Sequence, residues 1–398
     1  MAIDDEDLQH LTGRLANPAS SPATDIRMNR RLLGTLGQYG LDAAVADPPV
    51  DRRSPSAEVH AIVEASHQNS EALLGVLPID DPYDTVSTVE RRDHVIGGVD
   101  GNEITLSIYS PADLSQARPA VVYLHGGGMA IVTADNRATR AWCREIAARG
   151  LVVVGVDFRS AHHRGPNPFP AGLDDCVSAV RWLHEQRATL GISNLVLQGE
   201  SGGANLALAV ALRANREGWA DEISGVYAVA PYISGGYGWA QDRKLAELPS
   251  LIENDGYFIN CAEMDLFVQS YDPWGDHAED PLAWPYHAGE EDLRGLPPHV
   301  IAVDELDPLR DEGVAYFRKL QDVGVPVVGR INLGLTHAAE SIFRFVFGSL
   351  YRLHAFNGDP HPGNYLFHPG GRITFLDFGL VKRFTADETA LFERLIQA

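Results

Sequence analysis

The chain has 398 residues and a formal net charge of −22 at pH 7. This acidic balance leaves no basic surface to neutralise phosphates, so we expect neither nucleic acid nor an anionic membrane as a partner. Cys143, Cys176 and Cys261 form an odd set without CxxC or CxxH spacing. The set predicts neither a disulfide framework nor a zinc site and favours a reduced, cytoplasmic setting. A small-molecule substrate is the expected partner, and the oligomeric state stays open.

The N-terminal residues 1–85 carry helical patterning and predict a helical cap. Residues 1–7 are acidic and have no apolar core of a signal peptide, and no later run approaches the ~20 apolar residues that cross a bilayer. Within the cap, Ser54 and Pro55 predict the start of a helix that contains Val59.

The segment 86–355 predicts one α/β domain. It opens with a hairpin, in which residues 92–96 and 104–108 flank a turn at Asp100 and Gly101. Helix-like stretches then alternate with six strand-like runs, at 120–124, 151–156, 195–197, 226–230, 300–303 and 327–333. This alternation predicts a mostly parallel central sheet with helices on both faces.

A candidate nucleophile lies between a predicted strand and a predicted buried helix. Ser201 occupies the centre of Gly199-Glu200-Ser201-Gly202-Gly203, which fits the pattern G-x-S-x-G. By chance the pattern alone is common, but the apolar run before it and the all-round apolar stretch 204–212 after it supply the right context. The glycines allow the strand to reverse sharply into the helix.

A glycine run after another predicted strand indicates an oxyanion hole. The run is His125-Gly126-Gly127-Gly128, and it leaves backbone N–H groups open to a carbonyl oxygen. We expect the amides of Gly127, Gly128 and Gly202 to be the donors. The alternative is a glycine-rich turn without a catalytic role. We expect His125 to brace this loop through hydrogen bonds.

A serine nucleophile needs a base and an acid that orients the base. His337 follows the last strand-like run, where a triad histidine belongs, and is the predicted base. His162 and His163 are the nearest competitors, but they lie in an earlier polar loop where solvation explains them.

Two aspartates compete for the role of the acid. Asp304 and Asp307 both follow the run 299–303, and we prefer Asp307 because Pro308 fixes the loop after it. Asp311 and Glu312 fall in the first turn of the next helix, where the helix dipole stabilises carboxylates without any catalytic role.

A long insertion between the strands near Val229 and Ile301 is rich in aromatic residues. Insertions of this length often form lids or binding surfaces, and the alternative is that their aromatic side chains pack onto the core. The residues concerned are Tyr237, Trp239, Tyr257, Phe258, Trp274, Trp284 and Tyr286.

These motifs resemble those of the hormone-sensitive lipase-like esterases. The similarity runs from the N-terminus to His337 and includes the segments 156–159, 231–236 and 248–258. It implies an α/β-hydrolase fold with an N-terminal cap that cleaves carboxylic esters or lactones, a macrocyclic lactone among them, without a cofactor or metal. By the same resemblance the acid maps onto Asp307 and the base onto His337.

The C-terminus departs from that family. Asn357-Gly358-Asp359-Pro360-His361-Pro362-Gly363-Asn364 and Leu376-Asp377-Phe378-Gly379 resemble the catalytic loop and metal-binding segment of the ABC1-type atypical kinases. The resemblance implies that Asp359, Asn364 and Asp377 surround nucleotide-bound magnesium. A kinase also needs an N-lobe, which so short a segment cannot supply. We therefore expect 356–398 to be a non-functional fragment, with 343–351 as a candidate replacement for the family's last helix.

The sequence thus predicts a serine carboxylesterase. The first alternative is an atypical kinase-like nucleotide-binding protein that uses the C-terminal motifs. A ligand-sensing protein on a hydrolase scaffold is the other alternative. Such proteins usually lose a triad residue, and here Ser201, Asp307 and His337 are all present.

Overall fold

The computed structural model describes residues 11–77, 89–112 and 115–336. Beyond them it describes the backbone of four short strands, which pair as β9 (Ala355–Asn357) with β12 (Val381–Arg383) and β10 (Tyr365–Phe367) with β11 (Ile373–Phe375). His337, Asp359, Asn364 and Asp377 lie outside the described residues. No helix in the described part has the length and apolarity needed to cross a bilayer.

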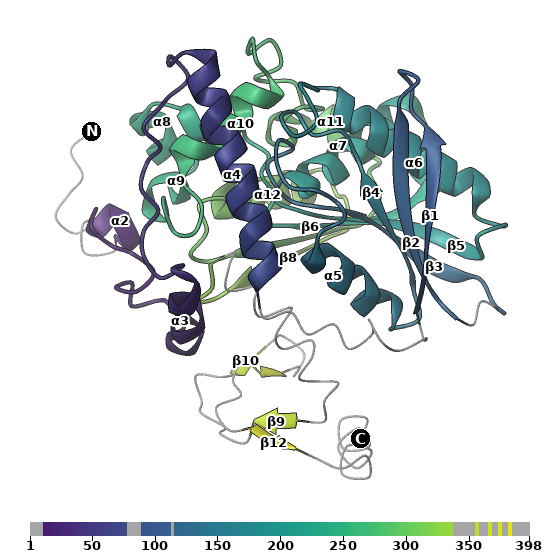
Figure 1. Ribbon diagram of the computed structural model, residues 1–398, viewed down its shortest axis with the longest axis horizontal. Coiled ribbons are helices and arrows are strands. Elements are labelled where there is room, and N and C mark those ends of the chain that lie inside the picture. Colours follow the sequence, from purple (N-terminus) through teal and green to yellow (C-terminus); the bar gives the residue numbers. More distant parts are fainter. Residues whose placement is uncertain are drawn as a thin grey trace.

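An eight-stranded sheet forms the centre of the fold, as predicted (Figure 1). Its strand order is β1-β2-β4-β3-β5-β6-β7-β8, and every pair from β4 onward is parallel. The strands are β1 (Val89–Gly97), β2 (Glu103–Pro111), β3 (Arg118–Leu124), β4 (Val152–Asp157), β5 (Ile192–Glu200), β6 (Ile223–Val229), β7 (His299–Asp304) and β8 (Val327–Asn332). Each predicted strand-like run lies within one of these strands or extends at most one residue beyond it.

The first two strands form the predicted antiparallel hairpin. Gly101 takes a φ of +77° in the connecting turn, and Ile96 pairs with Ile104. Ile104, Leu106 and Ile108 are buried while the residues between them are not, so one face of the hairpin covers the core. The hairpin joins the rest of the sheet through the antiparallel pairing of β2 with β4.

Helices cover both faces of the sheet. The connection from β3 through α5 (Arg137–Ala147) leads to β4, which lies on the side of β3 that faces the hairpin. The connections through α6 (Ala171–Gln186), α7 (Gly202–Glu217) and α12 (Arg310–Asp322) lead in the opposite direction, toward β8. Because parallel crossovers are right-handed, α5 lies on one face and the other three lie on the opposite face.

The helix that follows Ser201 is the most deeply buried of these. Along α7 every residue from Gly202 to Leu212 is buried, and α7 packs on β5, β6 and β3. The all-round apolar character of 204–212 therefore has the cause that we expected.

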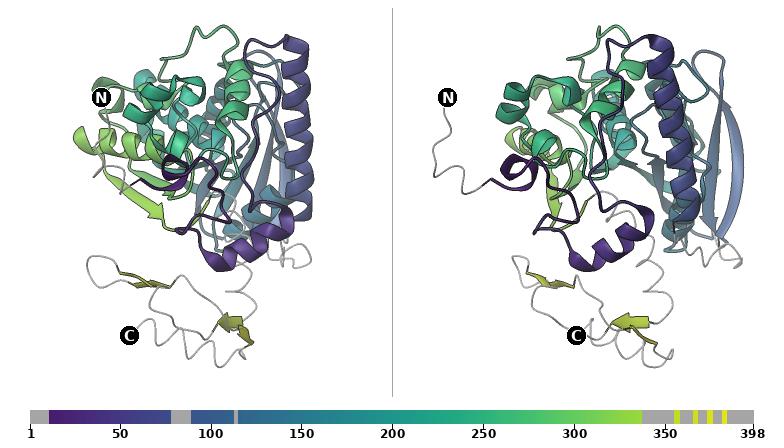
Figure 2. Two further views of the ribbon diagram at one scale, coloured as in Figure 1. Left: turned by 90° about the vertical axis from the view of Figure 1, so that its left-hand side faces the viewer. Right: turned by 60° about the vertical axis from the view of Figure 1, so that its left-hand side comes forward.

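The N-terminal residues form helices around the sheet. They are α2 (Gly13–Ala16), α3 (Arg30–Leu36), the short 3-10 helix η1 (Gly37–Tyr39) and the long α4 (Ser56–Val76). Pro55 is the N-cap of α4, one residue later than a Ser54 cap would place it. Val59 and Val63 bury one side of α4, which contacts α5 and α10 and runs along the outside of the molecule (Figure 2).

The insertion between β6 and β7 is mostly packed structure. Tyr237, Tyr257 and Trp284 are fully buried, whereas Trp274 is 77% exposed. Packing thus accounts for most of the aromatic residues. The helices of the insertion are η3 (Gly236–Gly238), α8 (Gln241–Glu247), α9 (Ser250–Glu253), α10 (Cys261–Tyr271), η4 (Pro285–His287) and α11 (Glu290–Leu293), and η2 (Ala220–Glu222) precedes β6.

The buried His299 on β7 makes stability sensitive to acid. Burial lowers its pKa to about 4, while its ring Nδ1 lies 2.6 Å from the carbonyl oxygen of Pro297. The unfolded chain binds a proton at this residue below about pH 6.5, and the folded chain does so only near its lowered pKa. Stability is therefore lost as the pH falls between these values.

We predict that protonation of His299 in the unfolded chain makes the free energy of unfolding about 2 kcal/mol lower at pH 5 than at pH 7. His299→Asn, which keeps an N–H donor but cannot titrate, should reduce the acid sensitivity by that amount in urea unfolding at the two pH values. His277→Asn is the control, because the His277 side chain is 40% exposed. Equal acid sensitivity of wild type and His299→Asn would contradict the prediction.

Candidate active site

Ser201 is the single residue between the end of β5 and the start of α7, at a sharp turn of the chain. Its φ of 54° and ψ of −118° lie in a region that non-glycine residues rarely adopt. A Cβ on Gly199 would lie 2.0 Å from the carbonyl oxygen of Gly203, and one on Gly203 would lie 2.0 Å from that of Leu124. Both positions therefore require glycine, as expected from the sequence.

The backbone of Ser201 is fully tied into the sheet and the helix. Its N–H donates to the carbonyl oxygen of Val229 at 2.9 Å, and its own carbonyl accepts from Asn205 and Tyr232 at 3.1 and 3.3 Å. Although Ser201 is the N-cap of α7, its side chain makes no capping hydrogen bond. The hydroxyl is thus left to the cavity that Ser201 lines.

The glycine run lies beside this turn. A Cβ on Gly126 would lie 3.6 Å from that of Ser201, and one on Gly202 would lie 2.8 Å from the amide nitrogen of Gly128. Gly127 and Gly128 have φ values of +104° and +58°. Within the described residues no backbone carbonyl accepts from their amides. The N–H of Gly202 belongs to the first turn of α7, where helix amides lack intrahelical partners. The residues that carry the three expected donors thus lie in two adjoining segments, the glycine loop and the start of α7, next to Ser201.

His125 is buried beneath the glycine loop. Its ring stacks on Phe158 with centroids 4.3 Å apart, and Nδ1 lies 2.7 Å from the carbonyl oxygen of Gly126. Burial lowers the pKa of His125 and favours the neutral ring. These contacts suit the bracing role expected from the sequence.

The cap helix α4 holds the other end of this loop. His67 Nδ1 accepts the N–H of Val132 at 3.0 Å, and Val132 has an unfavourable φ of 71°. Glu71 accepts from the N–H and the hydroxyl of Thr133, at 2.7 and 2.9 Å. Sequence reasoning missed His67 and Glu71, because nothing in the pattern of α4 shows which loop it meets.

The histidine pair 162 and 163 corrects one expectation. His162 is 8% exposed rather than solvated, its ring centroid lies 4.2 Å from that of His60 with the rings tilted by 45°, and its Nε2 lies 3.2 Å from the carboxylate of Glu64. His163 stacks on His67. Burial lowers the pKa of both His162 and His163. The pair therefore helps to dock α4 on the loop that follows β4.

A cavity of about 360 Å³ opens at Ser201. Its walls come from the glycine loop, from α4, from α10 and from the segment before α10. The apolar part includes Leu73 and Leu74 of α4, Leu77 at its C-cap, Phe258, and Met264 and Phe267 of α10. Phe258 is thus one aromatic residue of the insertion that does form a binding surface.

Asp307 lies in the loop between β7 and α12. Its side chain is buried, and Oδ1 accepts the N–H of Leu309 at 2.8 Å. The competitor Asp304 is the last residue of β7, where its carboxylate accepts from the side chain of Asn332 on β8 at 2.8 Å. Asp304 therefore has a role in the sheet, whereas Asp307 follows the carboxyl end of the strand.

The chain immediately before His337 lies against the Asp307 loop. The N–H of Leu306 donates to the carbonyl oxygen of Leu335 at 3.0 Å, and the N–H of Gly334 donates to the Glu305 carboxylate at 2.7 Å. His337 itself lies outside the described residues. The structure therefore brings together Ser201, Gly127, Gly128 and Gly202, and fixes Asp307 beside the segment that leads to His337.

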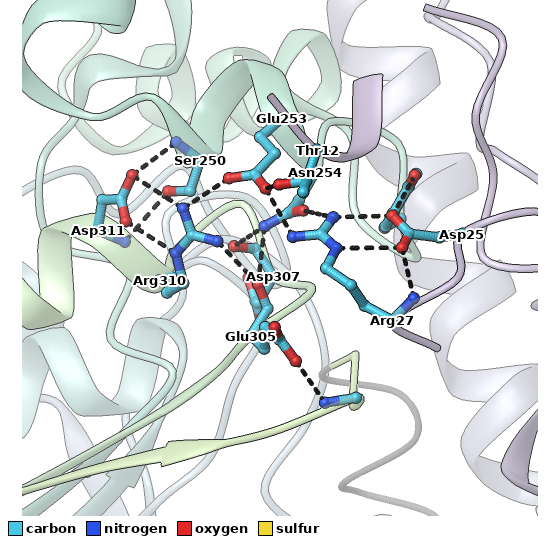
Figure 3. A network of polar contacts seen from close by, with 12 residues as sticks. Thr12, Asp25, Arg27, Ser250, Glu253, Asn254, Glu305, Asp307, Arg310 and Asp311 are labelled. Atoms are coloured by element: carbon cyan, nitrogen blue, oxygen red, sulfur yellow. Dashed lines mark hydrogen bonds and ion pairs between the residues drawn. The ribbon is translucent and has the colours of Figure 1, made fainter. Parts of the chain in front are cut away.

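A polar network contacts the Asp307 loop (Figure 3). The Asn254 side chain donates to the carbonyl oxygens of Glu305 and Asp307, both at 3.1 Å, and accepts from Arg27 at 3.2 Å. Arg310 also donates to the carbonyl oxygen of Glu305, at 3.1 Å. Asn254 is fully buried, so it is the main link between the N-terminal segment and this loop.

The network is held by paired charges. Glu253 accepts from Arg27 at 2.6 Å and from Arg310 at 2.7 Å, and Asp25 accepts from Arg27 at 2.7 Å. Burial opposes the charge of Arg27, but the Asp25 hydrogen bond and the nearby carboxylates outweigh it and raise its pKa. No local sequence pattern indicates these partners, since Arg27 and Glu253 are 226 residues apart.

Glu312 anchors the wall of the cavity. Its carboxylate accepts from the N–H of Ile233 at 3.0 Å, from the hydroxyl of Tyr237 at 2.8 Å and from the N–H of Ser234. Burial raises its pKa to about 8 despite these hydrogen bonds. Tyr237 stacks on Tyr232, which lines the cavity. Glu312 thus has a structural role beyond the helix dipole expected from the sequence.

Comparison with known proteins extends these observations. A family profile described as an alpha/beta hydrolase fold matches residues 121–341. A solved structure titled brefeldin A esterase, a bacterial homologue of human hormone-sensitive lipase, is 52% identical, with a TM-score of 0.82 over 86% of this chain and 94% of that one. Carboxylesterase NlhH of Mycobacterium tuberculosis is 33% identical over 58% of this chain and 69% of its own. Ethyl acetate hydrolase of Pseudomonas putida is 32% identical over 60% and 72%.

A second family profile, the ABC1 atypical kinase-like domain, matches residues 319–398. Its first part overlaps the hydrolase match. In the structure this first part is the end of α12 and strand β8, which pairs with β7 in the central sheet. The kinase-like resemblance therefore begins within elements that complete the hydrolase sheet.

The position of Asn254 generates a prediction. Asn254→Ala removes one hydrogen bond to the carbonyl of Glu305 and one to that of Asp307, and should lower the free energy of unfolding by about 1–3 kcal/mol. Urea unfolding measures the change. Asn17→Ala is the control, because Asn17 is exposed, and its effect should stay within about 0.5 kcal/mol. Equal stabilities of the two variants would contradict the importance given to Asn254.

Proposed function

The chain belongs to the alpha/beta-hydrolase fold family and is a carboxylic ester hydrolase, and on this premise we propose that Ser201, His337 and Asp307 are its catalytic triad. The observation that carries the proposal is the strained turn that presents Ser201 to a cavity beside three glycine amides. The order Ser, Asp, His along the chain is the order usual for this fold.

In the first half-reaction the Ser201 hydroxyl attacks the ester carbonyl carbon. His337 takes the hydroxyl proton as the new bond between the serine oxygen and the carbonyl carbon forms, and Asp307 orients the imidazole and stabilises its positive charge. His337 then gives the proton to the departing alkoxide, so that the alcohol leaves and an acyl-Ser201 ester remains. For a lactone the released hydroxyl stays on the same molecule.

In the second half-reaction water replaces the alcohol. His337 takes a proton from the water as its oxygen bonds to the acyl carbon, and returns a proton to the Ser201 oxygen as the acyl–enzyme bond breaks. The products are the carboxylic acid and the free enzyme. No cofactor or metal is needed for either half-reaction.

The oxyanion of each tetrahedral intermediate is assigned to the amides of Gly127, Gly128 and Gly202. Preorganised N–H donors of this kind are worth on the order of 10²- to 10³-fold in rate each. The N-terminus of α7 adds its positive dipole end beneath the same point.

The role of His337 is supported by the chain that leads to it. Leu335 is hydrogen-bonded to Leu306, the residue before Asp307, and Thr336 is 1% exposed. The described chain therefore contacts the Asp307 loop up to the residues directly before position 337 in the sequence.

The proposed substrates are carboxylic esters and lactones, including a macrocyclic lactone of the brefeldin A type. The support for the macrolactone is the 52% identity to brefeldin A esterase, together with the predominantly apolar walls of the cavity. The proposed setting is the cytoplasm, because the three cysteines are unpaired and buried.

We propose the domain division expected from the sequence, with a cap at 1–85, a catalytic domain at 86–355 and a non-functional fragment at 356–398. The ABC1 profile match favours the alternative of nucleotide binding by this fragment. Titration with ATP and magnesium separates the two functions, since saturable binding would support the alternative.

The triad is tested by substitution. Ser201→Ala and Asp307→Asn should each lower kcat for p-nitrophenyl ester hydrolysis by at least about 10³-fold. The first variant lacks the nucleophile, and the second lacks the carboxylate that orients the base. Asp304→Asn is the matched control and should retain a kcat within about tenfold of wild type, since Asp304 bonds a sheet side chain. Full turnover by Ser201→Ala would refute the assignment.

The fragment is tested by truncation. A chain that ends at residue 355 should retain the esterase kcat/KM of the full chain, because the described cavity and the Asp307 loop use no residue beyond it. Steady-state kinetics and soluble yield measure the outcome. Loss of soluble, active protein on truncation would show that the fragment is structural.

A further inference from the structure

The cavity at Ser201 has an uneven charge distribution. Among the described residues that line it, Glu200 and Glu263 carry carboxyl groups, and there is no lysine or arginine. His125 is the only histidine among these described lining residues, and burial lowers its pKa and favours the neutral ring. The chain as a whole is also acidic, with a formal charge of −22. Among the described lining residues, the groups that a ligand meets are thus neutral or negatively charged.

Glu263 is fixed at the wall between the cap and α10. Its backbone N–H is held by the side chain of Asn260 at 3.0 Å, at the start of α10. Its carboxylate accepts from the hydroxyl of Ser66 on α4, and both residues line the cavity. The carboxylate is thus kept at a fixed place on the cavity wall.

This placement has consequences for both substrate and product. A free carboxylate on a substrate would lose its water on entry and face Glu200 and Glu263 in a medium of reduced dielectric constant, where like charges repel strongly. A hydroxyl or an ammonium group could instead donate to Glu263. The carboxylic acid that hydrolysis releases is repelled by the same groups once it ionises, which favours its departure.

We propose that Glu263 is a specificity-determining residue and that, with Glu200, it makes this cavity select esters that are neutral or positively charged over esters that carry a free carboxylate. The inference rests on the proposed function, because it concerns the esters that Ser201 attacks. It adds a substrate class that the apolar walls alone would not define.

The test uses three substrates that differ at one end of the acyl chain. They are p-nitrophenyl hexanoate, the mono-p-nitrophenyl ester of adipic acid, in which a carboxylate replaces the terminal methyl group, and p-nitrophenyl 6-aminohexanoate. The wild type should prefer the hexanoate over the adipate by about tenfold or more in kcat/KM. Ratios of kcat/KM are compared, because they do not depend on the fraction of active protein.

Glu263→Gln should reduce the preference for hexanoate over adipate by about fivefold or more and should lower the relative kcat/KM of the 6-aminohexanoate. Glu263→Asp retains the charge and should retain the wild-type order of the three substrates. Glu58→Gln is the matched control, because Glu58 is an exposed residue in the first turn of α4. It removes the same charge far from the cavity and should leave both ratios unchanged.

The failures are distinguishable. Inactivity of the wild type on all three esters would overturn the proposed function and this inference with it. Activity on the hexanoate with both ratios unchanged in Glu263→Gln would overturn this inference alone. Equal changes in Glu58→Gln and Glu263→Gln would also overturn it, since the effect would then come from the overall charge.

Discussion

The candidate site depends on a contact between backbones. Where β5 turns into α7, Gly199 and Gly203 approach each other and the carbonyl of Leu124 so closely that a methyl group at either glycine would collide with a main-chain oxygen. These atoms belong to β3, β5 and α7, so they cannot yield without separating the sheet from its most buried helix. The turn therefore forces Ser201 into its left-handed conformation, at a cost of roughly 1–3 kcal/mol that the surrounding packing bears.

The rest of the site is supported from outside the sheet. The N-terminal part of the chain contributes twice, once through Arg27, which binds Asn254 at the Asp307 loop, and once through His67 and Glu71 of α4, which bind Val132 and Thr133 after the glycine loop. In both places polar side chains form hydrogen bonds with backbone groups of the loop. Burying a backbone N–H or C=O group without a hydrogen bond is destabilising, so these hydrogen bonds favour one position of each loop. The cap thus shapes the cavity and also fixes the loops that border it.

Sequence patterns predicted the elements with local signals and missed the contacts that depend on the whole chain. The strands, the hairpin and the buried helix α7 follow from periodicity and apolar runs, and the glycine requirement at Gly199 and Gly203 follows from the motif. The link between Arg27 and Glu253 joins residues 226 positions apart, and no local pattern shows it. His162 was misjudged for the same reason, because the helix that buries it comes about 100 residues earlier. The assignment of His337 as the base stays a prediction.

The start of α12 links several parts of the site to one another. Asp307 precedes the helix, Arg310 binds Glu253 in its first turn, and Glu312 on the same turn holds the segment that carries Tyr237. A buried carboxylate whose pKa is raised to about 8 is costly, and replacing it with an apolar residue would leave two backbone N–H groups without an acceptor. Glu312 therefore couples the wall of the cavity to the helix that follows the acid, so a shift of α12 would move both together.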